Sequence, residues 1–161
     1  MPPMPEPFRF LLNPDVDRES SYSADKKEIL SLTGADSAYR AIRGWQGYAA
    51  TPLRPLPGLA AAAGVAELLY KDEGGRFGLG SFKALGGAYA LDRIVAERGT
   101  ADLTFACATD GNHGRSVAWG ARRAGAKAVI YVHEGVSEGR AEAIRTLGAT
   151  VVREGAHYDD S

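Results

Sequence analysis

Lys83 is the residue whose type and position most clearly suggest chemistry. It follows a glycine-rich loop in Gly78-Leu79-Gly80-Ser81-Phe82-Lys83. Ser81 is a good N-cap, so we expect Lys83 in the first turn of a helix that runs to about Arg98. Partial burial and the positive end of a helix both disfavour the charged form of a lysine, and a neutral amine can form Schiff bases. Lys83 is therefore a candidate catalytic residue, and a solvated surface lysine is the alternative.

Two phosphate-binding motifs do not fit this loop. A P-loop needs glycine directly before the lysine, where Phe82 stands, and a dinucleotide fingerprint that began at Gly78 would need its third glycine at Lys83. Gly86 and Gly87 each cost the expected helix about 1 kcal/mol relative to alanine. We therefore expect a close backbone or ligand contact at these two glycines.

A second candidate site is the hexapeptide Thr109-Asp110-Gly111-Asn112-His113-Gly114. It lies between an expected strand and an expected helix, and open parallel sheets bind ligands at the carboxyl ends of their strands. Backbone N–H groups at a helix N-terminus favour an anion such as a carboxylate. Asp110 and Asn112 add polar side chains there. An Asx-type cap with glycines for a tight turn is the alternative interpretation.

The elements that must position these residues alternate regularly. Apolar runs predict strands, and segments that begin with capping residues predict helices, in the order strand 103–108, helix 112–124, strand 128–132, helix 137–147 and strand 150–152. This order is typical of an α/β fold with an open, parallel βαβαβ sheet and helices on both faces. A three-stranded sheet with bare edges is incomplete, so we expect either a truncated piece of a longer protein or a chain that needs a partner.

The first 57 residues contain all eight prolines, and we expect them to be largely irregular. Asp36 and Gly44 are suited to cap and end a short helix over 36–43. Prolines make the segment 51–57 extended, because each disfavours a helical conformation of the residue before it. A short strand is expected to end at Lys71.

The composition excludes several classes of protein. A net charge of -1 argues against a nucleic-acid partner. The single cysteine, Cys107, excludes a disulfide scaffold and is expected to be a core residue. His133 and His157 are isolated and lack metal-ligand spacing, so we assign no metal. No apolar run approaches the roughly 20 residues of a membrane helix, and no secretory signal begins the chain. We expect a cytoplasmic protein with no membrane partner.

Together these motifs resemble the β-family, or fold type II, of pyridoxal-phosphate enzymes, which share a tryptophan synthase β-like architecture. The resemblance rests on Ser81-Phe82-Lys83 at a helix start and on the later Gly-Asn-His turn at 111–113. Within this family the chain is most similar to the ammonia-lyases that act on 2,3-diaminopropionate, from about Thr51 to the last residue. The matching segments are Lys71-Asp72-Glu73, Arg76-Phe77-Gly78-Leu79, Leu85-Gly86-Gly87 and residues 109–115.

Asp110 distinguishes this resemblance from its nearest alternative. Serine/threonine dehydratases usually have Ser before Gly-Asn-His and Ala-Gln after it, whereas this chain has Asp110 before and Gly114-Arg115 after. The resemblance implies a lyase that eliminates ammonia from 2,3-diaminopropionate, by α-proton abstraction and an aminoacrylate, to give pyruvate and ammonia. Lys83 and Asp110 would take the α-proton of opposite enantiomers from opposite faces.

The resemblance also implies binding roles. Lys83 would hold pyridoxal 5'-phosphate as a Schiff base, Asn112 would hydrogen-bond its 3′-oxygen, and Phe82 would pack near its ring. The substrate carboxylate would be held by the turn that contains Thr109, Asp110, Gly111 and His113. The family's phosphate-binding loop comes from a later segment that this sequence does not contain.

The implied organisation is a homodimer in the full-length form. Residues 1–99 would form an N-terminal extension and the part of the larger domain that carries Lys83, and residues 100–161 would form an incomplete smaller domain. Two alternatives stay open. One is a serine/threonine dehydratase-like lyase, and the other is a truncated, non-catalytic α/β module, which would leave this chain inactive by itself.

Overall fold

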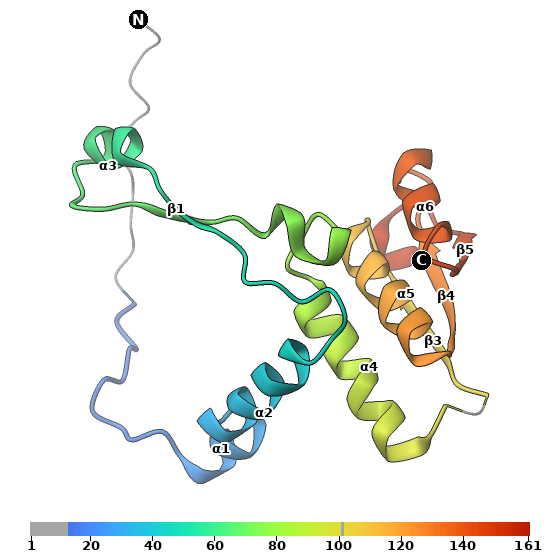
Figure 1. The fold of residues 1–161 in the computed structure, drawn as a ribbon, viewed down its shortest axis with the longest axis horizontal. Helices are drawn as coiled ribbons and strands as arrows, with labels where there is room; N and C mark the ends of the chain where they lie inside the picture. Colours follow the sequence, from blue (N-terminus) through green and yellow to red (C-terminus); the bar gives the residue numbers. More distant parts are fainter. Residues whose placement is uncertain (1–12, 101) are drawn as a thin grey trace, which may run out of the picture. The chain divides into compact units, whose positions relative to one another are not determined.

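The computed structural model describes residues 13–100 and 102–161 (Figure 1). Its internal contacts divide the chain into a unit that ends at Ala35 and a unit that begins at Asp36. In chain order the elements are α1 (Ala24–Ile29), α2 (Leu32–Arg43), β1 (Leu53–Pro55), α3 (Pro57–Ala63), β2 (Leu69–Lys71), the 3₁₀ helix η1 (Glu73–Gly78), α4 (Ala84–Arg98), β3 (Thr104–Ala108), α5 (Asn112–Ala124), β4 (Lys127–Val132), α6 (Glu138–Arg145), β5 (Thr150–Arg153) and the 3₁₀ helix η2 (Tyr158–Asp160). No helix of the described residues is both long and apolar enough to cross a membrane.

The unit that ends at Ala35 contains α1 and the start of α2. α1 buries no residue, and the Tyr22 hydroxyl donates to the carbonyl oxygens of Lys26 and Leu30, at 3.2 and 3.0 Å. The prediction of an irregular segment missed α1 because its sequence is polar and has no apolar stripe. The predicted helix over 36–43 is confirmed at its end, but α2 begins earlier, at Leu32.

The unit that begins at Asp36 is built on the parallel sheet β3-β4-β5. This confirms the predicted α/β class and the βαβαβ order. Ile130 and Val132 of β4 are fully buried in a core shared with α5 and α6, and an added Cβ at Gly114 of α5 would meet both Ile130 and Ile144 of α6. The two crossover helices therefore lie against the same face of the sheet, so the predicted placement of helices on both faces is wrong for the described residues, because right-handed crossovers between strands in the sequential order β3-β4-β5 stay on one side. Val129 and Tyr131 on the opposite face are partly exposed.

α4 packs lengthwise against α5 (Figure 1). Gly120 permits this close contact between the two helices, because an ideal Cβ there would lie 2.9 Å from the Cα of Ala88. The predicted N-cap of α4, Ser81, is wrong by two residues. The backbone at Gly80 has φ +72°, so the chain turns through 81–83 and Lys83 occupies the N-cap position rather than the first turn.

The segment before α4 is fixed by an antiparallel strand pair and a buried ion pair. β1 pairs with β2, with Leu53 opposite Lys71, as the extended segment and the short strand predicted. Arg76 is only 6% exposed, and its Nε donates to Glu73 at 2.7 Å. Trp45 and Trp119 pack against each other, since both are buried with ring centroids 5.7 Å apart.

Candidate active site

The turn after β3 is fixed by one buried hydroxyl. Thr109 is 2% exposed, and its Oγ1 accepts hydrogen bonds from the backbone N–H groups of Gly111 and Gly114, each at 3.0 Å. Gly111 has φ +154° and precedes α5, whose first N–H groups have no partner within the helix. The turn therefore presents free amides and a positive helix end at the carboxyl edge of the sheet.

Lys83 is fixed to α5 through its backbone. The buried Ser116 hydroxyl of α5 donates to the Lys83 carbonyl oxygen at 2.8 Å. Gly87 permits this approach, because an added Cβ there would lie 2.2 Å from Ser116 Oγ. The expected close contact is thus found at Gly87, whereas an added Cβ at Gly86 would meet nothing within 4 Å.

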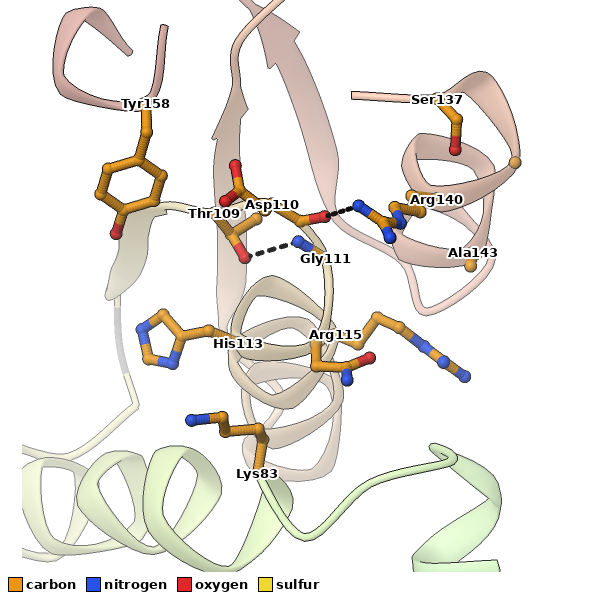
Figure 2. Close-up of a pocket in the computed structure, with 12 residues that line it drawn as sticks. Lys83, Thr109, Asp110, Gly111, His113, Arg115, Ser137, Arg140, Ala143 and Tyr158 are labelled. Carbon is orange, nitrogen blue, oxygen red and sulfur yellow. Dashed lines mark hydrogen bonds between the residues drawn. The ribbon is translucent and has the colours of Figure 1, made fainter. Parts of the chain in front are cut away.

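Lys83 and the first five residues of the hexapeptide, 109–113, line one cavity of about 770 Å³. Figure 2 shows Lys83 and His113 extending to one side of this cavity, Arg115 extending to the other, and Arg140 pointing from that other side toward Asp110. The lining residues are Lys83, Thr109, Asp110, Gly111, Asn112, His113, Arg115, Ser137, Gly139, Arg140, Ala143 and Tyr158. The structure therefore brings together all the predicted site residues except Phe82.

Phe82 and the Lys83 amine are both open to solvent. Phe82 is 56% exposed, and its ring centroid lies 5.0 Å from Lys83 Nζ. Lys83 is itself exposed. The partial burial that we expected around this amine is therefore not supplied by the described residues.

Sequence reasoning missed the basic side chains of the cavity. Arg140 of α6 donates from Nη1 to the Asp110 carbonyl oxygen at 3.4 Å (Figure 2). Arg115 has a buried Nε with no hydrogen-bond partner among the described residues. With Lys83, these groups give the cavity an excess of positive charge, which favours an anionic ligand. Ser137 and Arg140 follow β4, the strand after β3 in the chain. Because the carboxyl ends of parallel strands meet at one edge of a sheet, this position could have predicted that both residues lie near the 109–114 turn.

His133 is not isolated, contrary to the expectation from the sequence. Its Nε2 lies 3.0 Å from Asp110 Oδ1, and its Nδ1 lies 3.1 Å from the backbone nitrogen of Gly135. No metal-binding group of three or more His, Cys, Asp or Glu side chains occurs within 13–100 and 102–161.

The family model for pyridoxal-phosphate dependent enzymes matches residues 44–161. The chain belongs to this family. A diaminopropionate ammonia-lyase of Escherichia coli is 38% identical over 94% of this chain and 42% of its own length. The corresponding protein of Salmonella typhimurium is 40% identical over 71% of this chain and 33% of its own length.

A solved structure of this pyridoxal-phosphate dependent family is also similar. The Escherichia coli diaminopropionate ammonia-lyase in complex with an aminoacrylate-PLP azomethine reaction intermediate superposes with a TM-score of 0.74 and 43% identity. The match covers 80% of this chain and 35% of the Escherichia coli chain. The chain thus spans less than half the length of these relatives, and the expected fold type II architecture is confirmed.

The cavity fits the family's cofactor. Pockets for ligands of this size measure about 300–1,000 Å³, and about 770 Å³ is present here. The chemical groups of the cavity wall also fit the cofactor. The Lys83 amine can bond to the cofactor's aldehyde, and the Asn112 amide can donate a hydrogen bond to an oxygen on its ring. The surplus of Lys and Arg side chains suits the negative charge that the cofactor and an amino acid carry.

Proposed function

We propose that this chain is part of a pyridoxal-phosphate dependent ammonia-lyase that converts 2,3-diaminopropionate and one water into pyruvate and two ammonia molecules. The observation that carries the proposal is that Lys83, Asp110 and the 111–113 turn line a single cavity. The relatives support it, because proteins described as diaminopropionate ammonia-lyases are 38% to 40% identical to this chain.

In this proposal, four residues of the cavity region would bind the cofactor or move a proton. When bound, the cofactor supplies a ring that stabilises negative charge at the substrate α-carbon. Lys83 would hold the cofactor through Nζ and take the α-proton of one enantiomer. Asp110 would take the α-proton of the other, and Asn112 would donate to the cofactor's 3′-oxygen. Phe82 would pack beside the ring.

The substrate carboxylate would bind the turn of Thr109, Asp110, Gly111 and His113. The Thr109 hydroxyl fixes this turn through two hydrogen bonds. Free amides at the start of α5 are suited to a carboxylate. Because these donors are held before the ligand arrives, little ordering free energy is lost when it binds.

Borohydride reduction in the presence of pyridoxal phosphate tests the role of Lys83. We expect the reduced label to map to Lys83 and to disappear in Lys83→Ala. Lys127→Ala is the matched control, because Lys127 is an exposed lysine at the start of β4, and it should leave the label unchanged. Labels scattered over several lysines would contradict the assignment and would favour a non-catalytic module.

The nitrogen balance distinguishes the proposal from a serine/threonine dehydratase-like lyase. Elimination from 2,3-diaminopropionate releases two ammonia molecules for each pyruvate, whereas serine releases one. We expect the full-length protein to release pyruvate from diaminopropionate faster than from serine, at the two-to-one ratio. Faster turnover of serine would favour the dehydratase. Asp110→Asn should impair one enantiomer of diaminopropionate selectively.

We also propose the coarser organisation of the full-length protein. Residues 1–99 would belong to an extension and to the larger domain, and residues 100–161 to the smaller domain. The full-length protein would be a cytoplasmic homodimer, without nucleic-acid or membrane partners. A composition with balanced charge and one cysteine supports this. Light scattering of the full-length protein measures the oligomeric state.

A further inference from the structure

The sheet register places His133 beside Asp110. β3 and β4 pair in parallel, with Ala108 opposite Tyr131, and the Thr109 N–H continues the ladder by donating to the Tyr131 carbonyl oxygen at 3.0 Å. Two residues beyond Ala108 and Tyr131, the same register places Asp110 beside His133. The contact between their side chains is therefore set by backbone pairing in the most regular part of the fold.

The ring of His133 is held in one tautomer. The Gly135 backbone N–H can only donate, and it points to Nδ1 at 3.1 Å. Nδ1 must therefore accept, so the hydrogen of the neutral ring is on Nε2. Nε2 then donates to Asp110 Oδ1 at 3.0 Å. The imidazole thus links a backbone amide on one side to a carboxylate on the other.

Gly135 is required for this arrangement. An ideal Cβ at Gly135 would lie 2.9 Å from His133 Cε1 and 3.1 Å from Nδ1. Real Cβ atoms essentially never approach other atoms so closely, so any side chain there would displace the ring. Glycine at position 135 therefore lets the backbone of the loop after β4 hold the His133 ring.

Asp110 is held at two points. Its carboxylate accepts from His133 and its carbonyl oxygen accepts from Arg140. Its side chain is 59% exposed, whereas that of His133 is 21% exposed. Asp110 lines the cavity and His133 does not. His133 is thus placed behind Asp110, where it can orient the carboxylate without touching a ligand.

We propose that His133 is a positioning residue for Asp110, holding Oδ1 so that the remaining carboxylate oxygen is directed to the substrate. The inference rests on the proposed function, because it takes Asp110 as the group that acts on one enantiomer. A partner that fixes the tautomer and orientation of a reactive group is a recurring device in active sites. Loss of His133 should therefore harm only the reaction that needs the Asp110 carboxylate.

NMR of the 161-residue chain with ¹⁵N-labelled histidine tests the pair directly. At about pH 8.5, above the ordinary titration range of imidazole, we expect the His133 resonances of a ring with hydrogen on Nε2. Asp110→Ala should move the Nε2 resonance, and Gly135→Ala should move the Nδ1 resonance. Gly58→Ala is the control, because an added Cβ there meets nothing within 4 Å. A ring with hydrogen on Nδ1, or an Nε2 resonance unmoved by Asp110→Ala, would overturn the inference.

Kinetics of the full-length protein test the role. We expect His133→Leu to lower kcat roughly 10- to 100-fold for one enantiomer of diaminopropionate, with KM little changed, because misplaced groups cost rates of this size. His133→Gln keeps an amide donor and should restore most of the rate, and Glu134→Ala, an exposed neighbour, should have no effect. Equal losses for both enantiomers would overturn the positioning role. Absence of pyruvate from the wild-type protein would instead overturn the proposed function, and the NMR result would still decide the contact.

Discussion

The Ser116 hydroxyl donates to the Lys83 carbonyl oxygen at 2.8 Å, and this bond joins the start of α4 to the middle of α5. α5 begins at Asn112, so the same helix that holds the lysine backbone also begins in the ligand-binding turn. The distance between the two motifs recognised in the sequence is therefore fixed by a helix contact rather than by the intervening chain. This contact is the structural basis of a single site.

Gly87→Ala should break that contact. Its Cβ would lie 2.2 Å from Ser116 Oγ, so either helix must shift, and overpacking of this kind costs about 1–3 kcal/mol of unfolding free energy. Gly86→Ala is the matched control, because an added Cβ there meets nothing within 4 Å, and it should stabilise the helix by up to about 1 kcal/mol. Urea denaturation of both variants measures the difference. Equal effects of the two substitutions would contradict the close contact.

The two outcomes at these neighbouring glycines show what the sequence could predict. Two glycines in a helix predicted a close approach, but only the helix pairing decides that Gly87 faces Ser116 while Gly86 does not. The strands and crossover helices were predictable because their apolar periodicity is local. The true start of α4 was not, because a positive φ at Gly80 moves the turn and leaves Ser81 outside the helix.

The sequence predicted the two motifs of the site but not the side chains that surround them. Lys83 and the 109–114 turn have local signals, whereas His133 and Arg140 enter through strand order and register. The predicted strand starts, 103 and 128, would have placed Asp110 opposite Gly135, whereas the observed register, with Thr104 opposite Lys127, places it opposite His133. A parallel sheet drawn with that register would have indicated the contact, but side-chain distances require the fold.

Thr109→Val should loosen the ligand-binding turn. Valine keeps the shape of threonine but removes the oxygen that accepts from Gly111 and Gly114. The two amides would lose their acceptor, and each buried amide left unpaired costs about 1–3 kcal/mol. We expect lower stability in urea and faster hydrogen exchange at these amides. Thr109→Ser keeps the hydroxyl and should retain slow exchange; fast exchange in both variants would argue against the proposed role of the hydroxyl.

Glu73→Gln should lower stability near neutral pH and have less effect in acid. The hydrogen bond from Arg76 holds the pKa of Glu73 below its ordinary value of 4.5, despite some opposing burial. A depressed pKa in the folded state contributes stability above that ordinary value, and this stability is lost as pH falls through the folded pKa. We expect a loss of about 3 kcal/mol at neutral pH, since the substitution leaves the buried Arg76 charge without its partner.

Denaturation at about pH 7 and about pH 3 measures this pH dependence. Glu97→Gln is the control, because Glu97 pairs with Arg93 only at 4.0 Å and both side chains are more than 60% exposed. Exposed pairs contribute between 0 and about 1 kcal/mol. A loss of stability in Glu73→Gln that does not shrink on acidification would show that the ionised carboxylate is not the stabilising group.

Cys107 should be unreactive in the folded chain. Burial raises the pKa of its thiol to about 11, and the thiolate is the form that reacts with alkylating agents. An exposed thiol has a pKa near 8.5, so at about pH 8 the folded chain should react roughly 100-fold more slowly than the urea-unfolded chain. Because Cys107 is the single cysteine, the total rate of iodoacetamide labelling reports this residue alone. Comparable rates in the two states would mean that the α5 side of the sheet opens readily, and the rigid support inferred for the 109–114 turn would then be wrong.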